Sequence, residues 1–215
     1  MKGKIFNAQE VQAIIAGTKT MFREVIKPQP IQLEGFSDVY FDCYSKGNPW
    51  NCYTKGNKQP LGTIAKCPYQ VGQKIFVKES FVDFRSNNSD IFYKSDFEIN
   101  NLVKTADLKW RPAQHMKQEH SRLTLEITDV KVERLQDISV DDCWKEGMDY
   151  LPECCQNYIA IPDCNGNPTP SCCNNPNVVH PQPQFEQIWN ATHKKPKEKF
   201  EANPFVWVVN FKINK

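Results

Sequence analysis

A lysine just after a predicted helix is the first residue whose position suggests chemistry. Lys19 lies two residues after Gly17, which is predicted to end a short helix over residues 8–16. An ammonium group at this place could bind a phosphate, or it could act as a base if desolvation lowered its pKa. Position alone favours an ordinary surface lysine, so this residue needs a second observation.

Glu146, near the end of a second predicted helix, is in a position that the helix dipole disfavours for a negative charge. Ser139 is a typical N-cap, and Asp141 and Asp142 follow in the first turn, where the helix dipole favours negative charge. Glu146 lies in the last turn before Gly147, where the dipole disfavours an anion by up to about 1 kcal/mol. Such a position can mark a functional site. An exposed glutamate that tolerates the small penalty is the simpler interpretation.

Helix and strand patterns indicate how these two residues are positioned. Asn7 and Glu10 form a capping box at the start of the first helix, and Gly17 is suited to the left-handed residue after its end. Strands are predicted from alternating or continuous apolar residues over 71–84, 90–96, 121–135 and 203–213. The alternation changes phase near Thr128 and Asp129, which predicts a bulge.

The order of these elements predicts an α+β fold, or a barrel decorated by short helices. A third helix is predicted over 185–192. Residues 35–63 read as an irregular excursion with short strands, for example at 39–43. Residues 151–183 hold seven prolines and five cysteines without periodicity and read as an inserted loop. We therefore expect one domain over 1–215 with two irregular segments.

Composition excludes several classes of protein. The chain has 215 residues and a net charge of +2, and no stretch approaches the ~20 apolar residues of a membrane span. Its first residues lack the apolar core of a signal peptide, so we expect a cytoplasmic protein without a membrane partner. Residues 104–122 are locally basic, which fits either a phosphate-attracting surface or a solvated loop.

The inserted loop offers a possible metal site. Its five cysteines are Cys154, Cys155, Cys164, Cys172 and Cys173. Zinc prefers four ligands, commonly in pairs spaced by two to four residues, whereas these paired cysteines are adjacent. Reduced thiols are favoured over a structural zinc ion, and we expect no other cofactor.

Five segments in the same order resemble the ASCH family, particularly its longer prophage-encoded members. They are "AGTKTMFREVIKPQP" (16–30), "CPYQVGQKIFVKES" (67–80), "WRPAQHM" (110–116), "SRLTLEITDVKVERLQDISVDDCWKEG" (121–147), and "FEQIWNA" with "ANPFVWVVNF" (185–211). The resemblance implies a PUA-like β-barrel with a cleft beside the turn from helix to strand. It also implies RNA or nucleotide binding, and some small members of the family hydrolyse N4-acylated cytidines.

The same resemblance assigns roles and raises a discrepancy. Lys19 matches the lysine of the family's GxK motif, and Glu146 matches a glutamate that assists proton transfer. The hydrolytic members carry a nucleophilic threonine and an arginine where this chain has Phe22 and Glu24. Phenylalanine cannot attack an amide, so that mechanism does not carry over unless Thr20 or a water molecule replaces the nucleophile.

A binding role remains compatible with these changes. Phe22 could stack on a base or be a core side chain, and Lys19 and Arg23 could supply positive charge. Further residues expected at one basic and aromatic cleft are Lys78, Glu79, Trp110, Arg111 and His115. The sequence thus predicts a protein that binds RNA, another single-stranded nucleic acid or a nucleoside. The alternatives are a hydrolase of N4-acylated cytidine or a ribonuclease that uses Lys19 and Glu146, and an interaction protein that binds no such ligand.

Overall fold

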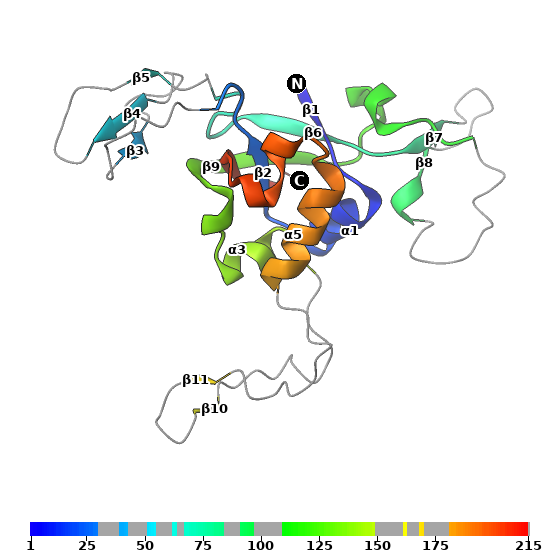
Figure 1. Cartoon of the computed structure of the whole chain (residues 1–215). Helices are drawn as coiled ribbons and strands as arrows, with labels where there is room; N and C mark the ends of the chain where they lie inside the picture. The colour runs from blue at the N-terminus through cyan, green and yellow to red at the C-terminus, as the bar shows by residue number, and fades with distance from the viewer. Residues whose placement is uncertain are drawn as a thin grey trace.

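The computed structural model describes residues 1–29, 39–42, 51–54, 62–63, 67–83, 91–96, 109–148, 161–162, 168–169 and 181–214. This part of the chain is a mixed α+β fold built on a five-stranded sheet (Figure 1). In spatial order the strands are β1 (Lys2–Ile5), β6 (Lys74–Lys78), β9 (Thr124–Arg134), β12 (Phe205–Ile213) and β2 (Met21–Val25). β1 runs parallel to β6, and the other neighbours are antiparallel.

Helix α1 (Ala8–Ala16) forms as its sequence predicts. The Asn7 side chain accepts a hydrogen bond from the Glu10 N–H at 2.8 Å, and the Glu10 carboxylate accepts one from the Asn7 N–H at 2.9 Å. Gly17 ends the helix at φ 79°. This capping box and left-handed end fix where the chain turns toward Lys19 and β2.

The phase change expected in the longest strand is a bulge between β9 and β12. Asn210 pairs with Asp129, whereas the next residue, Phe211, pairs with Ile127, so Thr128 is an extra residue in β9. An extra residue bends a strand and increases its twist. The bulge therefore helps the sheet to curl around the residues on its concave side.

Strand β12 is buried on both faces, as its continuous apolar run predicts. Trp207, Val209 and Phe211 belong to one buried cluster, which we call the α1 core because Val11 and Ile14 of α1 complete it. Val206 and Val208 point the opposite way into a second cluster, the α3–α5 core. A central strand with apolar residues at consecutive positions is expected to separate two cores in this way.

Two helices cover the second core. Helix α3 (Val140–Lys145) begins after Ser139, whose side chain accepts a hydrogen bond from the Asp142 N–H at 3.1 Å. Helix α5 (Pro181–Thr192) contributes Phe185 and Trp189 to the α3–α5 core. In Figure 1 both helices lie below β6 and β9, close to α1.

The predicted start of the third helix is wrong by four residues. Residues 181–184 were expected in the inserted loop or ahead of the helix, but α5 already begins at Pro181. Proline fits the first turn of a helix, where its missing N–H would have no partner within the helix. The remainder of the predicted loop lies mostly outside the described residues.

Short elements complete the described structure. Strands β7 (Phe81–Asp83) and β8 (Ile91–Tyr93) form the hairpin expected after β6. Two further small sheets consist of β3 (Val39–Asp42), β4 (Asn51–Thr54) and β5 (Gly62–Thr63), and of β10 (Ile161–Pro162) and β11 (Pro168–Thr169). The 3₁₀ turns are Ala113–His115, Gln118–His120, Leu135–Asp137, Pro196–Glu198 and Phe200–Ala202. Across the ranges described, no helix has the length and apolarity needed to span a bilayer.

The two outer strands of the main sheet approach each other through side chains. β1 and β2 are its edges, and no main-chain pairing between them closes the sheet within the described residues. Lys4 of β1 nevertheless forms an ion pair with Glu24 of β2, and the rings of Phe6 and Phe22 meet edge to face at 5.8 Å. The sheet is therefore strongly curled, with a gap between its edges.

Candidate functional site

Lys19 and Glu146 meet although 126 residues separate them in the sequence. The Lys19 ammonium donates to Glu146 Oε2 at 2.9 Å and to the Glu146 main-chain oxygen at 2.7 Å. The main chain holds the two segments side by side, because the Thr20 N–H donates to the Lys145 oxygen at 2.9 Å. Only 3% of Lys19 and 5% of Glu146 are exposed, so neither is the surface residue that the simpler interpretations assumed.

Gly147 permits this close approach. Its φ is 80°, in the left-handed region, and a Cβ placed there would lie 3.0 Å from the Lys19 Cβ and 3.1 Å from the Ala13 Cβ. Any other residue would be strained and would push against both neighbours. The glycine that ends α3 therefore also sets the spacing between Lys19 and Glu146.

Arg23 links Glu146 to two further carboxylates. Its Nη1 donates to Glu146 Oε1 at 2.9 Å, and its Nη2 contacts Asp142 at 3.1 Å and Glu133 at 2.5 Å. Burial alone would lower the pKa of Arg23, but the attraction of Glu146 and Glu133 outweighs it, and the pKa is raised. Burial would likewise raise the pKa of Asp142, yet Lys131 and Arg23 outweigh it, and that pKa is lowered. The network thus keeps Arg23 charged and Asp142 ionised.

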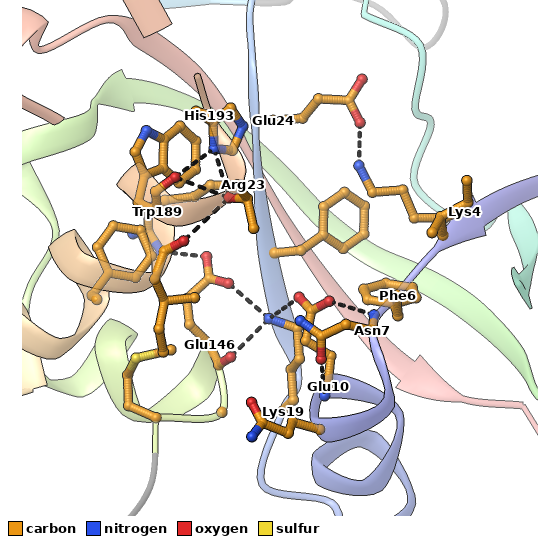
Figure 2. A pocket seen from close by; sticks show the side chains of 18 residues that line it. Lys4, Phe6, Asn7, Glu10, Lys19, Arg23, Glu24, Glu146, Trp189 and His193 are labelled. Carbon is orange, nitrogen blue, oxygen red and sulfur yellow. Dashed lines mark hydrogen bonds and ion pairs between the residues drawn. The ribbon is translucent and has the colours of Figure 1, made fainter. Parts of the chain in front are cut away.

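A cavity of about 360 Å³ opens beside this network, shown in Figure 2. Lys19, Arg23 and Glu146 line it. α5 contributes an aromatic wall that includes Phe185 and Trp189. A cavity of this size and mixed lining is at the lower end of the range for small-molecule sites.

Formal charges around the cavity balance. The cationic side chains are those of Lys4, Lys19 and Arg23, and the carboxylates are those of Glu10, Glu24 and Glu146. Each cation has at least one carboxylate within 3.4 Å. A site whose cations are already paired offers little attraction for a polyanion.

The Lys4–Glu24 pair also lines the cavity. Tyr69 donates a hydrogen bond from its hydroxyl to Glu24 at 2.6 Å, and the Lys4 ammonium lies 4.7 Å from the centre of the Phe22 ring. Burial would raise the pKa of Glu24, but Lys4 and Tyr69 outweigh it, and the pKa is lowered. Glu24 is therefore ionised at neutral pH.

Trp189 and His193 form a rigid part of the wall. Their rings stack at 3.8 Å with an angle of 11° between the planes. The indole Nε1 donates to the Glu198 main-chain oxygen at 2.8 Å, which fixes the tryptophan. Burial lowers the pKa of His193, so its imidazole is neutral at pH 7. Figure 2 shows this pair on the side of the cavity opposite Lys19.

Phe22 is not a free stacking platform. It is 3% exposed and packs in the α1 core against Phe6, Tyr69 and Phe211. Only a small part of its surface reaches the cavity. Of the two interpretations that the sequence left open, the packing of Phe22 favours the core side chain, because its strand position points it into the curled sheet. Thr20 does not line the cavity.

The expected cleft residues after β6 lie elsewhere. Lys78 donates to the main-chain oxygen of Gln114 at 2.9 Å, and Glu79 is 3% exposed and bonded to Ser95 and Arg122. Glu79 lines a separate cavity of about 290 Å³. Neither residue lines the cavity beside Lys19.

The segment over 110–116 also lies apart from Lys19. Arg111 exchanges main-chain hydrogen bonds with Phe81 at 2.8 and 3.2 Å, which places the segment against β7. Figure 1 shows β7 at the right, well away from α3. The side chains of Arg111 and His115 are exposed and that of Trp110 is half-buried, and none lines the cavity. The structure therefore does not bring all the predicted residues to the cavity beside Lys19.

The predicted metal ligands lie outside the described residues. Cys154, Cys155, Cys164, Cys172 and Cys173 all fall in that part of the chain. Within the described ranges, no group of three or more His, Cys, Asp or Glu side chains could hold a metal ion. Burial raises the pKa of Cys143, a free thiol in the α3–α5 core, to about 11.

Several cavity residues gave little sign of their role in the sequence. Glu10 was accounted for by its capping box, yet its carboxylate also lies 3.4 Å from the Lys19 ammonium. Trp189 was assigned to the apolar side of a helix, which is correct but does not reveal that it borders a cavity. No sequence pattern marked Lys4 or His193 as cavity residues, because most of the other residues of the cavity are distant from them in sequence.

Comparison with known proteins yields no relative: no family model, no curated protein and no solved structure matches the chain.

Proposed function

We propose that the cavity beside Lys19 and Glu146 binds a single neutral nucleobase or nucleoside, on an ASCH-type fold of the PUA-like class. The observation that carries the proposal is a buried Lys19–Glu146 pair at the wall of a 360 Å³ cavity. Buried charges that border a cavity are common at functional sites. The aromatic wall of α5 supplies the apolar contacts that a planar ring requires.

Charge favours a nucleoside over a strand of RNA. Lys19 is paired with Glu146 and Glu10, and Arg23 with three carboxylates, so neither ammonium nor guanidinium is available for a phosphate without breaking an ion pair. Strand-binding proteins instead line a groove with unpaired cations. A heterocycle without a net charge is therefore the better fit, which narrows the ligand classes that the sequence left open.

The curled sheet supports the PUA-like part of the proposal. A bulge bends β9, and side chains of β1 and β2 bridge the gap between the sheet edges. Sheets of this kind approach a small barrel without complete main-chain closure. The ASCH part of the proposal rests on the five sequence segments that resemble this family.

The test compares ligands and salt concentrations. Calorimetric titration with the four ribonucleosides is expected to show binding that changes little between about 50 and 200 mM salt, because a neutral ligand releases no counterions. Lys19→Met and Glu146→Gln should each weaken it by about 10-fold or more, since each exposes the ligand to an unpaired buried group. Arg111→Ala is the matched control, because Arg111 lies outside the cavity, and it should bind normally. Tight, salt-sensitive binding of single-stranded RNA without nucleoside binding would refute the proposal.

One observation favours a second candidate, a hydrolase of N4-acylated cytidine or of RNA. The Lys19 ammonium and the Glu146 carboxylate are in hydrogen-bond contact at the cavity wall, so a proton could pass between them and a substrate. With Phe22 in the core and Thr20 outside the cavity, water would have to be the nucleophile. Turnover of N4-acetylcytidine or RNA that is lost in Glu146→Gln would establish this candidate; equal rates in the two proteins would reject it.

A further inference from the structure

The cavity runs along an edge of the main sheet. Three consecutive residues of β2 line it: Phe22, Arg23 and Glu24. Neighbouring side chains on a strand point to opposite faces of the sheet. A cavity on one face of the sheet would contact only every second residue of β2. Because this cavity contacts three consecutive residues, it lies at the free edge of β2, where the main chain can contact a ligand.

The hydrogen bonds between β2 and β12 show which main-chain groups face that edge. Beside the two ends of β2, the Thr20 oxygen accepts from the Phe211 N–H at 2.9 Å, and the Ile26 N–H donates to the Phe205 oxygen at 3.1 Å. In an antiparallel pair, every second residue directs both its N–H and its C=O to the partner strand. The even-numbered residues of this strand are therefore the ones bonded to β12.

Arg23 has the opposite orientation. It pairs with Val208 in the register of β2 and β12, but its N–H and C=O point away from β12. Only 6% of Arg23 is exposed, and no described residue forms a hydrogen bond with either main-chain group. Buried main-chain groups in proteins nearly always have a partner, which can be a ligand or a water molecule. Arg23 lines the cavity, and the strand edge that carries these two groups faces it.

We propose that the main-chain N–H and C=O of Arg23 bind the ligand directly, by pairing with an adjacent acceptor and donor on the edge of a heterocycle. This inference rests on the proposed function and specifies the ligand: its base must carry a ring or exocyclic N–H beside an acceptor. Uracil, cytosine, adenine and guanine all have such an edge. Methylation of a ring N–H, or dimethylation of an exocyclic amino nitrogen, removes its donor. The proposed hydrogen bonds use main-chain groups and no side chain. The residue types at 22–24 therefore could not indicate this binding mode.

The short free edge of β2 fits a nucleobase better than an added peptide strand. An added strand would pair with several residues of β2. The cavity borders only Phe22, Arg23 and Glu24, and of these Arg23 alone offers its main chain. The single N–H donor and single C=O acceptor of Arg23 match the hydrogen-bonding edge of one heterocycle.

Hydrogen exchange followed by NMR tests the inference in the free protein. The amides of Phe22 and Glu24 are bonded to β12 and should exchange slowly, whereas the Arg23 amide should exchange at least about 10-fold faster, because exchange follows local protection. An Arg23 amide as slow as its two neighbours would overturn the inference, whatever ligand is used.

A second measurement uses the four ribonucleosides and, for each that binds, the same nucleoside with its donor N–H fully replaced by methyl. These are 3-methyluridine, 1-methylguanosine, N4,N4-dimethylcytidine and N6,N6-dimethyladenosine. Bound nucleoside should slow the Arg23 amide selectively and leave the Val25 amide unchanged, because Val25 shares the edge but lies outside the cavity. Methylation should weaken binding by about 5- to 150-fold, the range for loss of a paired donor and acceptor. Binding that depends on Lys19 but ignores methylation would overturn this inference and leave the proposed function intact. Absence of binding by all four nucleosides would overturn both.

Discussion

Replacing Glu146 by glutamine tests whether the buried ion pairs hold the site together. Glu146 accepts from Arg23 on Oε1 and from Lys19 on Oε2, both at 2.9 Å. A glutamine amide has one acceptor oxygen and places an NH₂ group against the other cation. Either Lys19 or Arg23 then loses one of its carboxylate partners while it stays buried. Breaking one partner of a buried pair costs about 3–5 kcal/mol. We expect the lower value of about 3 kcal/mol, because Lys19 retains Glu10 and Arg23 retains Asp142.

The assay is urea unfolding of four proteins at neutral pH: wild type, Glu146→Gln, Lys19→Met and the double variant. In the double variant the glutamine oxygen can accept from Arg23 and no unpaired ammonium remains. We therefore expect it to be more stable than the sum of the single changes predicts, by about 2 kcal/mol, within the range measured for residues in contact. A control change, Glu126→Gln, breaks the exposed pair with Lys212 and should cost less than about 1 kcal/mol.

The coupling between the two changes decides the outcome. If the effects of Glu146→Gln and Lys19→Met are additive within about 0.5 kcal/mol, the two side chains do not stabilise each other and the description of the site is wrong. If Glu146→Gln costs no more than Glu126→Gln, the glutamate is not buried in a charged form. Either result would remove the basis of the proposed function.

Three further predictions concern the same region. Gly147→Ala should lower the free energy of unfolding by more than about 1 kcal/mol, because it strains a left-handed residue against Lys19 and Ala13; thermal unfolding measures this, and an unchanged melting temperature contradicts it. The pKa of Asp142 is lowered on folding, so its contribution is full above the ordinary aspartate pKa and is lost as pH falls below about 4; urea titrations should show a shallower acid loss in Asp142→Asn than in wild type. Cys143, with its pKa raised to about 11, should resist alkylation at neutral pH in the folded state and react in urea, as peptide mapping by mass spectrometry would reveal.

Local features of the fold could be predicted from the sequence because their causes are local. Asn7, Glu10 and Gly17 specify both ends of α1 within a few residues, and the phase change at Thr128 is visible in the alternation of the strand. The burial of β12 on both faces also follows from its own residues. In each case the physical cause lies within one element, so no knowledge of the other elements is needed.

The candidate site was predictable only in part. The meeting of Lys19 and Glu146 was anticipated through the resemblance to a family, since nothing in the local pattern relates two residues so far apart. The contribution of α5 was missed because helical spacing shows which face is apolar but not what the helix packs against. The location of Arg111 apart from the cavity was also missed, because its contact with Phe81 is through the main chain, and side-chain patterns do not report such contacts.

The position of β12 in the sheet has a consequence for synthesis on the ribosome. Within the part of the chain that the structure describes, β2, which carries Arg23, joins the sheet through β12 alone, and β12 contributes the register that orients it. Residues 205–213 are translated long after β2 has left the exit tunnel. Until they emerge, β2 cannot pair with β12, so the guanidinium network and the cavity wall must both assemble after residues 205–213 have been made.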